Sequence, residues 1–382
     1  MMSVPRVLFQ IWDIVSTTLI SIYVFLYDVY ANHFSSGPNN NPSYHQPHGP
    51  TASSFGMGGN SDPKNLCGRT VRLTKGSVKV ESLLGEGGFA YVYLCRRGDG
   101  GETKYALKVS NMSGVEQARK ERDVGMRMES SNVCGVVDFG NIPDKDTGVD
   151  VGSCYLLFPY ITLSLRAHLN SYTKSAPSPL LPIPNLPPSE VTQYFSGIIA
   201  GIQHMHSRGF AHMDLKVDNV MIRDGNAVLV DMGSASRTFT KPTVSRSDAA
   251  RLADQAASNT TVIIRPPELF EGGLRQGDSF DVFKVDVWGL GCMLYALNFG
   301  WSPFEVEYDR QGRGLRYVDC SQLRVLGDGW DKWRGGGEVG RRWEVMEREG
   351  WRGVCRKCLR QEQKERCPVG GILEEGAVQN LI

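Results

Sequence analysis

The sequence lacks an excess of charge of either sign. Its 382 residues contain 42 Lys and Arg against 41 Asp and Glu, a formal net charge of +1. A chain balanced in this way has no general electrostatic attraction to nucleic acid or to an anionic surface. We therefore expect no nucleic-acid partner, and every other partner has to be argued from individual sites. The length allows one large domain or two lobes with a sizeable core.

The sequence also lacks a cysteine pattern typical of disulfides or of zinc. The nine cysteines are odd in number and scattered, which favours reduced thiols. Cys355 and Cys358 form one CxxC pair with Cys367 nearby, but no second ligand pair at zinc spacing follows. We expect these cysteines to be free thiols on a C-terminal helix.

A third absence is a hydrophobic run long enough to cross a membrane. The uncharged run IVSTTLISIYVFLY covers residues 14–27 between Asp13 and Asp28, and it falls short of the roughly 20 apolar residues that span hydrocarbon. A spanning helix would have to bury Asp13, at a cost of about 3 kcal/mol. A helix lying in the membrane interface avoids this cost. A secretory signal and a helix packed on the domain remain alternatives for the apolar segment 1–30.

Residues 31–66 differ in composition from everything that follows. They are rich in Asn, Pro, Ser, Gly and His and contain few apolar residues. Such a segment cannot bury enough apolar surface to order itself. We predict a flexible linker, followed by a globular region whose pattern begins near Val78.

A cluster of glycines stands between two strand-like segments in LLGEGGFAYVYL, residues 83–94. Gly85, Gly87 and Gly88 precede YVYL, whose aromatic and branched residues favour a strand. Glycine lets the backbone approach a phosphate closely because no side chain intervenes, although a plain hairpin turn has the same composition. The order strand, glycine loop, strand differs from Rossmann and Walker sites and points to a lid over phosphates.

A lysine and a glutamate downstream could complete a phosphate site. Lys108 lies in the strand-like KYALKVS between Leu107 and Val109, so its side chain points to the face opposite to theirs. Glu121, in the helical stretch VEQARKERDVGMRM, could hold the ammonium group of Lys108 against phosphate oxygens. Taken singly, either residue could equally be solvated surface.

The stretch AHMDLKVDNVMIRDGNAVLVDMGS, residues 211–234, carries a dense group of polar side chains. Apolar residues at helical spacing over 189–207 predict a helix that leads the chain into it. Asp214 and Asn219 stand five residues apart, and Asp231 follows the strand-like AVLV. Carboxylate and amide oxygens are the ligands that Mg²⁺ prefers, so this stretch indicates a site for magnesium and phosphate.

From about Val78 to Ile372 the chain resembles a eukaryotic protein kinase, because six motifs occur in the same order. They are the glycine loop, the strand lysine, the helix glutamate, HMDLKVDN, DMG and RPPE. GEGGFAYVYL, DMGS and VDVWGLGCMLYALNFGWSPFE most resemble the Numb-associated kinases, and among these the myristoylated and palmitoylated serine/threonine kinase branch. The resemblance implies an α+β, two-lobed protein kinase fold. Its parts are a kinase domain over 67–377, with a small β-rich N-lobe over about 67–158 and a larger helical C-lobe over about 161–377, and a tail over 378–382.

The resemblance also implies a role for each residue of the motifs. Asp214 would accept the proton of the substrate hydroxyl, and Lys216 would steady the transferring phosphoryl group. Asn219 and Asp231 would supply oxygen ligands to Mg²⁺. The residues implied to hold the C-lobe together are Glu268, Asp286 and Arg366. The residues implied to bind ATP are Leu84, Gly85, Glu86, Gly87, Gly88, Phe89, Val92, Lys108 and Glu121.

The implied activity is transfer of the ATP γ-phosphoryl group to serine or threonine hydroxyls of protein substrates, with ATP and Mg²⁺ as cofactors. Met213 replaces the usual arginine of HRD and Pro266 the alanine of APE. A pseudokinase scaffold that binds nucleotide or partners is therefore the alternative. Residues 307–345 match the family poorly, which leaves substrate choice open. For the proline-rich stretch SAPSPLLPIPNLPP, residues 175–188, we expect an extended surface loop.

Members of this family act at Golgi, endosomal or vacuolar membranes and are often attached by acyl chains. The resemblance therefore implies the cytoplasmic face of an internal membrane, with the cytosol as second choice and association through the N-terminal segment. The sequence departs from the acylated pattern, because Met1-Met2-Ser3 offers no N-terminal glycine and the first cysteine is Cys67.

Overall fold

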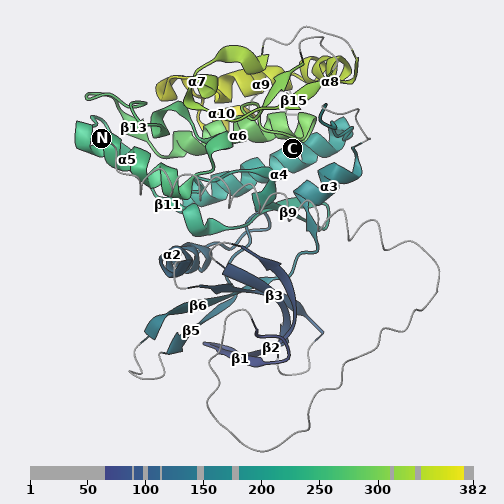
Figure 1. Cartoon of the computed structure of the whole chain (residues 1–382), viewed down its shortest axis with the longest axis vertical. Helices are drawn as coiled ribbons and strands as arrows, with labels where there is room; N and C mark the ends of the chain where they lie inside the picture. Colours follow the sequence, from purple (N-terminus) through teal and green to yellow (C-terminus); the bar gives the residue numbers. More distant parts are fainter. Residues whose placement is uncertain are drawn as a thin grey trace, which may run out of the picture.

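The computed structural model describes residues 65–87, 90–97, 102–111, 114–143, 150–173, 180–309, 314–331 and 337–373. In Figure 1 these residues form two lobes, one built around a sheet and the other mostly helical, which confirms the predicted α+β architecture. The apolar segment 1–30, nearly all of the predicted linker 31–66 and the tail 378–382 lie outside the described residues. Of the helices in the described ranges, none combines the length and the apolar character that a membrane crossing requires.

The strands of the smaller lobe are β1 (Thr70–Leu73), β2 (Gly76–Glu86), β3 (Ala90–Arg97), β4 (Lys104–Ser110), β5 (Asp138–Pro143) and β6 (Asp150–Pro159). They form one antiparallel sheet in the order β1-β2-β3-β4-β6-β5. Because side chains alternate along a strand, Leu107 and Val109 of β4 are buried in the core while Lys108 points to the other face. Leu66, at the end of the predicted linker, belongs to the same core. One helix, α2 (Val115–Gly125), packs against β6.

The helices of the larger lobe are α3 (Leu165–Ser171), α4 (Pro188–Ser207), α5 (Arg246–Asn259), α6 (Phe283–Phe299), α7 (Gln322–Val325), α8 (Gly337–Arg348), α9 (Trp351–Cys358) and α10 (Val369–Leu373). Its strands are short: β7 (Leu163–Ser164), β8 (Phe210–Ala211), β9 (Val220–Arg223), β10 (Asn226–Leu229), β11 (Ser236–Arg237), β12 (Thr240–Lys241), β13 (Phe280–Asp281), β14 (Val306–Tyr308) and β15 (Leu315–Tyr317). Short 3₁₀ helices that matter below are η2 (Val217–Asn219), η3 (Met232–Ser234), η5 (Pro267–Leu269) and η7 (Gln363–Glu365).

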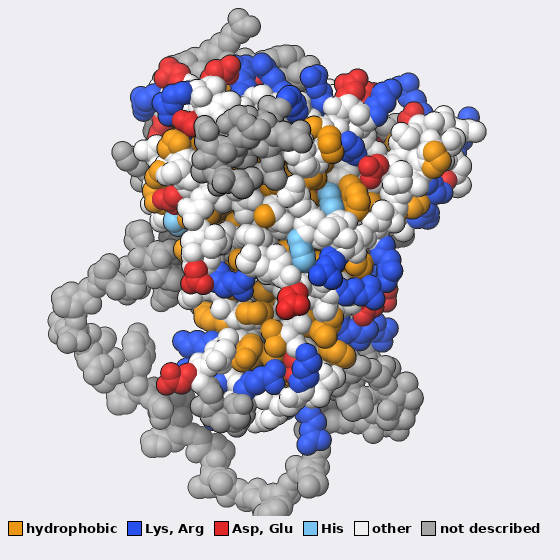
Figure 2. All heavy atoms as spheres, turned by 180° about the vertical axis from the view of Figure 1, so that it is seen from behind, with side chains coloured by type: hydrophobic (Ala, Val, Ile, Leu, Met, Phe, Trp, Pro, Cys, Tyr) orange, Lys and Arg blue, Asp and Glu red, His pale blue; other side chains and the backbone are white. Residues whose placement is uncertain are grey.

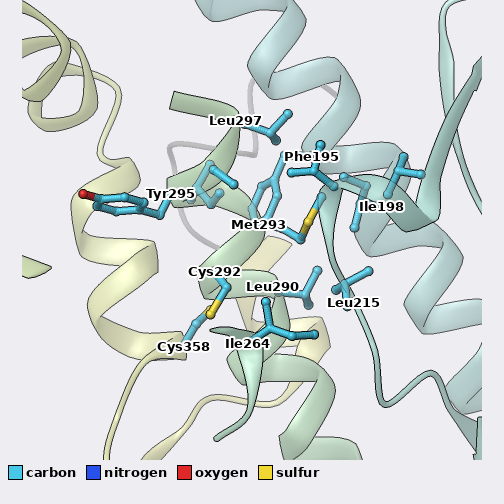
Figure 3. Packing of buried hydrophobic residues seen from close by; sticks show 14 of the residues in the cluster. Phe195, Ile198, Leu215, Ile264, Leu290, Cys292, Met293, Tyr295, Leu297 and Cys358 are labelled. Atoms are coloured by element: carbon cyan, nitrogen blue, oxygen red, sulfur yellow. The ribbon is translucent and has the colours of Figure 1, made fainter. Parts of the chain in front are cut away.

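Helix α6 is the centre of the larger lobe. It is apolar on all sides, and every residue from Val285 to Phe299 is buried, which is typical of a core helix. Figure 3 shows Met293 and Leu297 on the side of α6 that faces Phe195 of α4. The polar stretch that begins at His212 therefore follows a helix that is packed firmly against α6.

The described half of the proline-rich stretch, residues 180–187, belongs to the core of the larger lobe. Ile183 and Leu186 are buried, and Nη1 of Arg342 in α8 donates a hydrogen bond to the Leu186 carbonyl oxygen at 2.8 Å. The expectation of a surface position is therefore wrong for this half, whereas the expected extended backbone is present, with isolated β-bridges from Pro184 to Thr173 and from Leu181 to Leu315. Its isoleucine and leucine side chains cover apolar surface that water would otherwise contact.

Much of the poorly matching region 307–345 is also folded. It contributes to the β14–β15 hairpin and contains α7 and the beginning of α8. Trp330 and Trp343 are buried, each within about 6.3 Å of the Tyr295 ring between centroids. This region therefore extends the hydrophobic core around α6.

Candidate active site

Three charged side chains from separate elements meet between the lobes. The ammonium nitrogen of Lys108 in β4 lies 2.7 Å from Glu121 Oε2 in α2 and 2.9 Å from Asp231 Oδ1. Glu121 is buried, whereas the Asp231 side chain is 41% exposed. The structure therefore brings together the lysine, glutamate and aspartate that the sequence predicted for one site.

The pKa values in this group follow from burial and from mutual attraction. Burial disfavours the ammonium form of Lys108, but the carboxylates of Asp231 and Glu121 outweigh it and raise the pKa of Lys108. Attraction to Lys108 lowers the pKa of Asp231 to about 2. Burial raises the pKa of Glu121 above the ordinary value of a carboxyl group. Lys108 and Asp231 are thus both charged at neutral pH.

Asp231 occupies a backbone conformation that is rare for a residue with a side chain. Its φ of 61° and ψ of 72° lie in the left-handed region, which costs of order 1–3 kcal/mol outside glycine. It follows β10, whose residues Ala227, Val228 and Leu229 are buried and fix the strand. The turn at the end of this strand directs the carboxylate toward Lys108.

The Asp214 carboxylate is held at both oxygens. Oδ1 accepts a hydrogen bond from the Thr261 backbone N–H at 2.9 Å, and Oδ2 accepts one from Asn219 Nδ2 at 3.1 Å. Lys216 Nζ lies 3.0 Å from the same Oδ2 and also donates to Thr261 Oγ1 at 2.7 Å. Asp214 is 7% exposed, so an acidic group with a fixed orientation stands beside an ammonium group.

The residues predicted for magnesium present oxygen atoms beside the charged groups of the site. Asn219 Nδ2 donates to the Asp214 carbonyl oxygen at 2.8 Å as well as to its carboxylate, so the Asn219 amide oxygen is turned away from Asp214. The ionisable groups here are the carboxylates of Glu121, Asp214 and Asp231 and the ammonium groups of Lys108 and Lys216. Three carboxylates against two ammonium groups leave one negative charge when all are ionised, and this donor set fits Mg²⁺.

Within the residues that the structure describes, no group of three or more His, Cys, Asp or Glu side chains forms a cage for a metal ion. Mg²⁺ does not require one, because it commonly takes one or two carboxylates from the protein and the remaining ligands from phosphates and water. The pair of Asn219 and Asp231 is therefore a sufficient protein contribution for such an ion.

The predicted glycine loop begins at the end of β2, and the structure describes it as far as Gly87. The Gly87 N–H donates to the Ala90 carbonyl oxygen at 2.8 Å, and Val92 of β3 is the direct cross-strand partner of Lys108 in β4. The predicted ATP-binding residues at the end of β2 are Leu84, Gly85 and Glu86. Those that lie outside the described residues are Gly88 and Phe89.

A buried carboxylate on α6 holds the beginning of the loop that carries Asp214. Asp286 Oδ1 accepts from the Met213 N–H and Oδ2 from the His212 N–H, each at 2.8 Å. His206 Nε2 lies 2.8 Å from the same Oδ2. Met213 has a φ of 71°, and its backbone N–H is held by Asp286.

Glu268 and Arg366 form a buried ion pair with two parallel hydrogen bonds. Arg366 Nη1 and Nη2 donate to Glu268 Oε1 and Oε2 at 2.6 and 2.7 Å, and Gln363 Nε2 donates to Oε1 at 2.9 Å. The Arg366 guanidinium also lies 4.9 Å from the centre of the Trp288 ring. Such a bidentate pair fixes geometry as well as distance.

Two residues of the site had not been predicted from the sequence. His206 contacts Asp286 from 80 residues away, and Gln363 contacts Glu268 from 95 residues away. Neither residue lies inside a motif. The packing of α4 on α6 brings His206 to Asp286, and the placement of η7 against η5 brings Gln363 to Glu268. No local signal in the sequence identifies either contact.

Comparison with known proteins covers this whole site. The profile of the protein kinase domain matches residues 78–376. Serine/threonine-protein kinase 16 of Rattus norvegicus is 31% identical over 258 residues, 64% of this chain and 77% of the relative. The Homo sapiens protein of that name is 30% identical over 265 residues, 68% of this chain and 82% of the relative. Serine/threonine-protein kinase ppk13 of Schizosaccharomyces pombe is 26% identical over 289 residues, 66% of this chain and 80% of the relative.

We predict that Asp286→Ala destabilises the larger lobe strongly. The substitution leaves the buried N–H groups of His212 and Met213 without an acceptor, and each costs about 1–3 kcal/mol. The free energy of unfolding, measured by denaturant titration, should therefore fall by about 2 kcal/mol or more. The exposed Asp254 of α5 gives a matched control, and Asp254→Ala should stay within about 0.5 kcal/mol. Equal effects of the two substitutions would contradict the role of Asp286.

Proposed function

The chain belongs to the protein kinase family and is a serine/threonine protein kinase that uses ATP, and on this premise we propose how its residues carry out the transfer. Asp214 accepts the proton of a serine or threonine hydroxyl as that oxygen attacks the γ-phosphorus and the bond to ADP breaks. The observation that carries this proposal is the Asp214 carboxylate, held at both oxygens beside Lys216. Positioning of this kind accounts for most of the catalysis in phosphoryl transfer.

Lys216 and Thr261 support the same step. The Lys216 ammonium group lies 3.0 Å from Asp214 Oδ2, where it offsets negative charge as the phosphoryl group moves to the substrate. Its second bond, to Thr261 Oγ1 at 2.7 Å, ties it to the segment before RPPE. The acceptor hydroxyl is thereby confined between the loop at 214 and the segment at 261.

The nucleotide phosphates would lie between the glycine turn and Lys108. Glu121 keeps the Lys108 ammonium group in place at 2.7 Å, and the raised pKa keeps it charged. Residues Asn219 and Asp231 would hold Mg²⁺, which neutralises phosphate charge when bound. Asp231 is then shared between the metal ion and Lys108, which already lowers its pKa.

We also propose the finer relationship and a membrane role. The motifs GEGGFAYVYL and DMGS, together with the similarity to serine/threonine-protein kinase 16, support the Numb-associated kinases and their myristoylated and palmitoylated branch. The apolar run at 14–27 supports association with the cytoplasmic face of an internal membrane such as Golgi, endosome or vacuole. A kinase needs cytosolic ATP, which favours that face over export.

A pseudokinase scaffold is the second candidate, and it rests on Met213 and Pro266. The Met213 side chain packs among apolar residues that include Val244 and Leu252, so it has a structural use. Neither Met213 nor Pro266 provides a group to Lys108 or Asp214. The complete set of charged contacts therefore favours transfer over scaffolding.

Phosphoryl transfer to a protein substrate can be measured directly. The purified chain with radiolabelled ATP and Mg²⁺ should phosphorylate a generic protein substrate on Ser or Thr. Asp214→Asn and Asp231→Asn should each lower the initial rate by about two orders of magnitude or more, because one removes the base and the other replaces a charged metal ligand by a neutral one. Asp254→Asn, on the exposed side of α5, should leave the rate unchanged. Transfer that persists in both site variants, with folding confirmed by circular dichroism, would contradict the roles assigned to Asp214 and Asp231.

We predict that activity depends little on phosphorylation of the segment between Asp231 and Glu268. A methionine thioether at 213 cannot bind a phosphate as an arginine would. The segment from Asp231 to Glu268 is ordered by its own contacts, among them the Ser245–Asp248 capping box of α5 and the Lys241–Asp248 ion pair. Enzyme treated with a protein phosphatase should therefore keep most of its initial rate.

The alternative receptors for a phosphate are Arg237, whose guanidinium lies 5.5 Å from the centre of the Phe210 ring, and Arg246, the first residue of α5. In the Arg237→Ala variant, the phosphatase-treated and the untreated enzyme should accordingly have the same initial rate. A loss of tenfold or more after phosphatase treatment, about 1.4 kcal/mol of barrier, restored by rephosphorylation, would show that loop phosphorylation controls the enzyme.

We predict that the apolar segment 1–30 holds the protein at a membrane. Deleting residues 1–30 should move the protein from the membrane fraction of cells to the soluble fraction, because it removes the apolar run. Kinase activity of the deleted form should be retained, since the site lies between residues 84 and 366. An unchanged distribution would mean that the segment is no anchor, and signal cleavage or glycosylation would show export.

A further inference from the structure

Three basic side chains stand side by side on the sheet of the smaller lobe. Lys79 of β2 is the direct cross-strand partner of Arg96 in β3, and Arg96 is the partner of Lys104 in β4. Directly opposite residues of an antiparallel pair point to the same face, with Cβ atoms about 5 Å apart. Arg72 of β1 shares this face, because it stands two residues from Thr70, the partner of Lys79. We call Arg72, Lys79, Arg96 and Lys104 the basic row.

The basic row faces away from the core of the lobe. Its strand neighbours Val71, Val78 and Cys95 are buried, so alternation along the strands turns the row to the other face. Of its four members, only Arg96 forms an ion pair with a described residue, at 2.6 Å from Glu81 Oε1. The other three are exposed. Four positive charges against one negative charge leave a net charge of +3.

The stability of the sheet does not account for the basic row. Like charges on directly opposite residues destabilise a strand pair. Lysine is common on edge strands, where it prevents pairing with another chain, but β2, β3 and β4 are interior strands. Lys104 also stands four residues from Lys108, about 14 Å along β4, so the row lies apart from the lysine of the nucleotide site. An anionic partner outside the chain would turn the repulsion within the row into attraction.

The excess of positive charge belongs to this lobe and not to the composition of the chain. The whole chain has a formal net charge of +1, whereas β1 to β4 contain six Lys and Arg against two Glu. Figure 2 shows lysine and arginine side chains on the smaller lobe, with apolar side chains between them. The smaller lobe is therefore the part of the molecule that an anionic surface would attract.

The arrangement of the basic row matches a flat surface. Neighbouring strands lie about 4.8 Å apart, so a row that crosses four strands presents its charges over a broad plane. Proteins that hold single-stranded nucleic acid stack the bases on aromatic side chains, but on the row's face of β3 the neighbours of Arg96 are Leu94 and Val92. A membrane that contains anionic lipid is flat and attracts clustered Lys and Arg. Its shape and charge both fit the row.

The chain enters the sheet beside the basic row. The Gly68 N–H donates to the Val80 carbonyl oxygen at 2.9 Å, next to Lys79. The predicted linker 31–66 connects this point to the apolar segment 1–30. A flexible linker of that length has ends on the order of 30 Å apart. An apolar segment that lies in a membrane interface would therefore keep the row near the lipid headgroups.

We propose that the basic row is a docking surface for a membrane that contains anionic lipid. The inference rests in part on the proposed membrane role of segment 1–30, and it adds a second contact of a different physical kind. The apolar segment holds the chain at the membrane, and the row turns the β1–β4 face of the smaller lobe toward the headgroups. Because such attraction acts over about 8 Å at physiological salt, the row contributes only when it lies at the surface.

Cosedimentation of the full chain with vesicles separates the two contacts. Vesicles of phosphatidylcholine alone measure binding by the apolar segment. Vesicles of phosphatidylcholine and phosphatidylserine measure that binding together with the attraction of the row. We expect a larger partition coefficient for the anionic vesicles, and high salt should remove the difference because it screens the charges.

A row variant and a control variant carry the same change of charge. The row variant replaces the three members that have no ion pair with a described residue: Arg72→Gln, Lys79→Gln and Lys104→Gln. The control variant replaces three exposed residues of the larger lobe: Arg341→Gln, Arg360→Gln and Lys364→Gln. Each cation near an anionic surface contributes about fivefold to partition. The row variant should therefore bind anionic vesicles on the order of a hundredfold more weakly than the control variant, and neutral vesicles equally well.

Removing the acidic neighbour of the row should have the opposite effect. Glu81→Gln should raise partition onto anionic vesicles by about fivefold and leave partition onto neutral vesicles unchanged. Kinase activity without vesicles should be the same in the row variant, the control variant and Glu81→Gln, which shows that each is folded.

The outcomes for the row and for the apolar segment are independent. Equal binding of the row variant and the control variant to anionic vesicles would overturn the proposal, whether or not deletion of residues 1–30 abolishes binding to neutral vesicles. Loss of binding to a double-stranded oligonucleotide in the row variant, with vesicle binding unchanged, would assign the row to nucleic acid and would also overturn it.

Discussion

The buried carboxylate of Asp286 is the interaction on which the rest of the site depends. A carboxylate removed from water is costly unless donors replace the lost hydration, and His206, His212 and Met213 do so at 2.8 Å each. Two of these donors are backbone groups, so the carboxylate fixes the path of the chain. Asp214 follows Met213 directly and takes its position from α6, the most buried helix of the larger lobe. The hydrogen bonds from the backbone of His212 and Met213 to Asp286 therefore do not involve the side chain at 213.

The second constraint acts across the lobes. Lys108 comes from the sheet, Glu121 from α2 and Asp231 from the turn after β10, and one ammonium group contacts both carboxylates. This arrangement favours a single placement of the sheet relative to the helical lobe, because a displacement breaks one contact or the other. The left-handed backbone of Asp231 costs of order 1–3 kcal/mol, and attraction to Lys108 offsets part of it. Strain at this position is thus tied to the placement of the lobes.

The sequence predicts contacts whose cause is local and misses those whose cause is packing. Strand alternation is enough to turn Lys108 away from Leu107, and a buried strand is enough to place Asp231 at its end. The contact of His206 depends on how α4 packs on α6, and that of Gln363 on how η7 lies against η5, 80 and 95 residues from their partners. The proline-rich stretch shows the same limit. Its composition predicts an extended backbone, but Leu186 is buried in the core of the larger lobe, and no local pattern reveals that core.

The ion pair of Glu268 and Arg366 joins two segments that lie far apart in the sequence. A buried ion pair contributes little net stability, because removing both charges from water costs about as much as their attraction returns. Its two parallel bonds and the carbonyl oxygens around Arg366 instead permit one register of the chain at Glu268. Thr261 lies seven residues before Glu268, and its N–H donates to Asp214 Oδ1 at 2.9 Å. Arg366, 98 residues beyond Glu268, therefore holds the end of the segment that also carries Thr261.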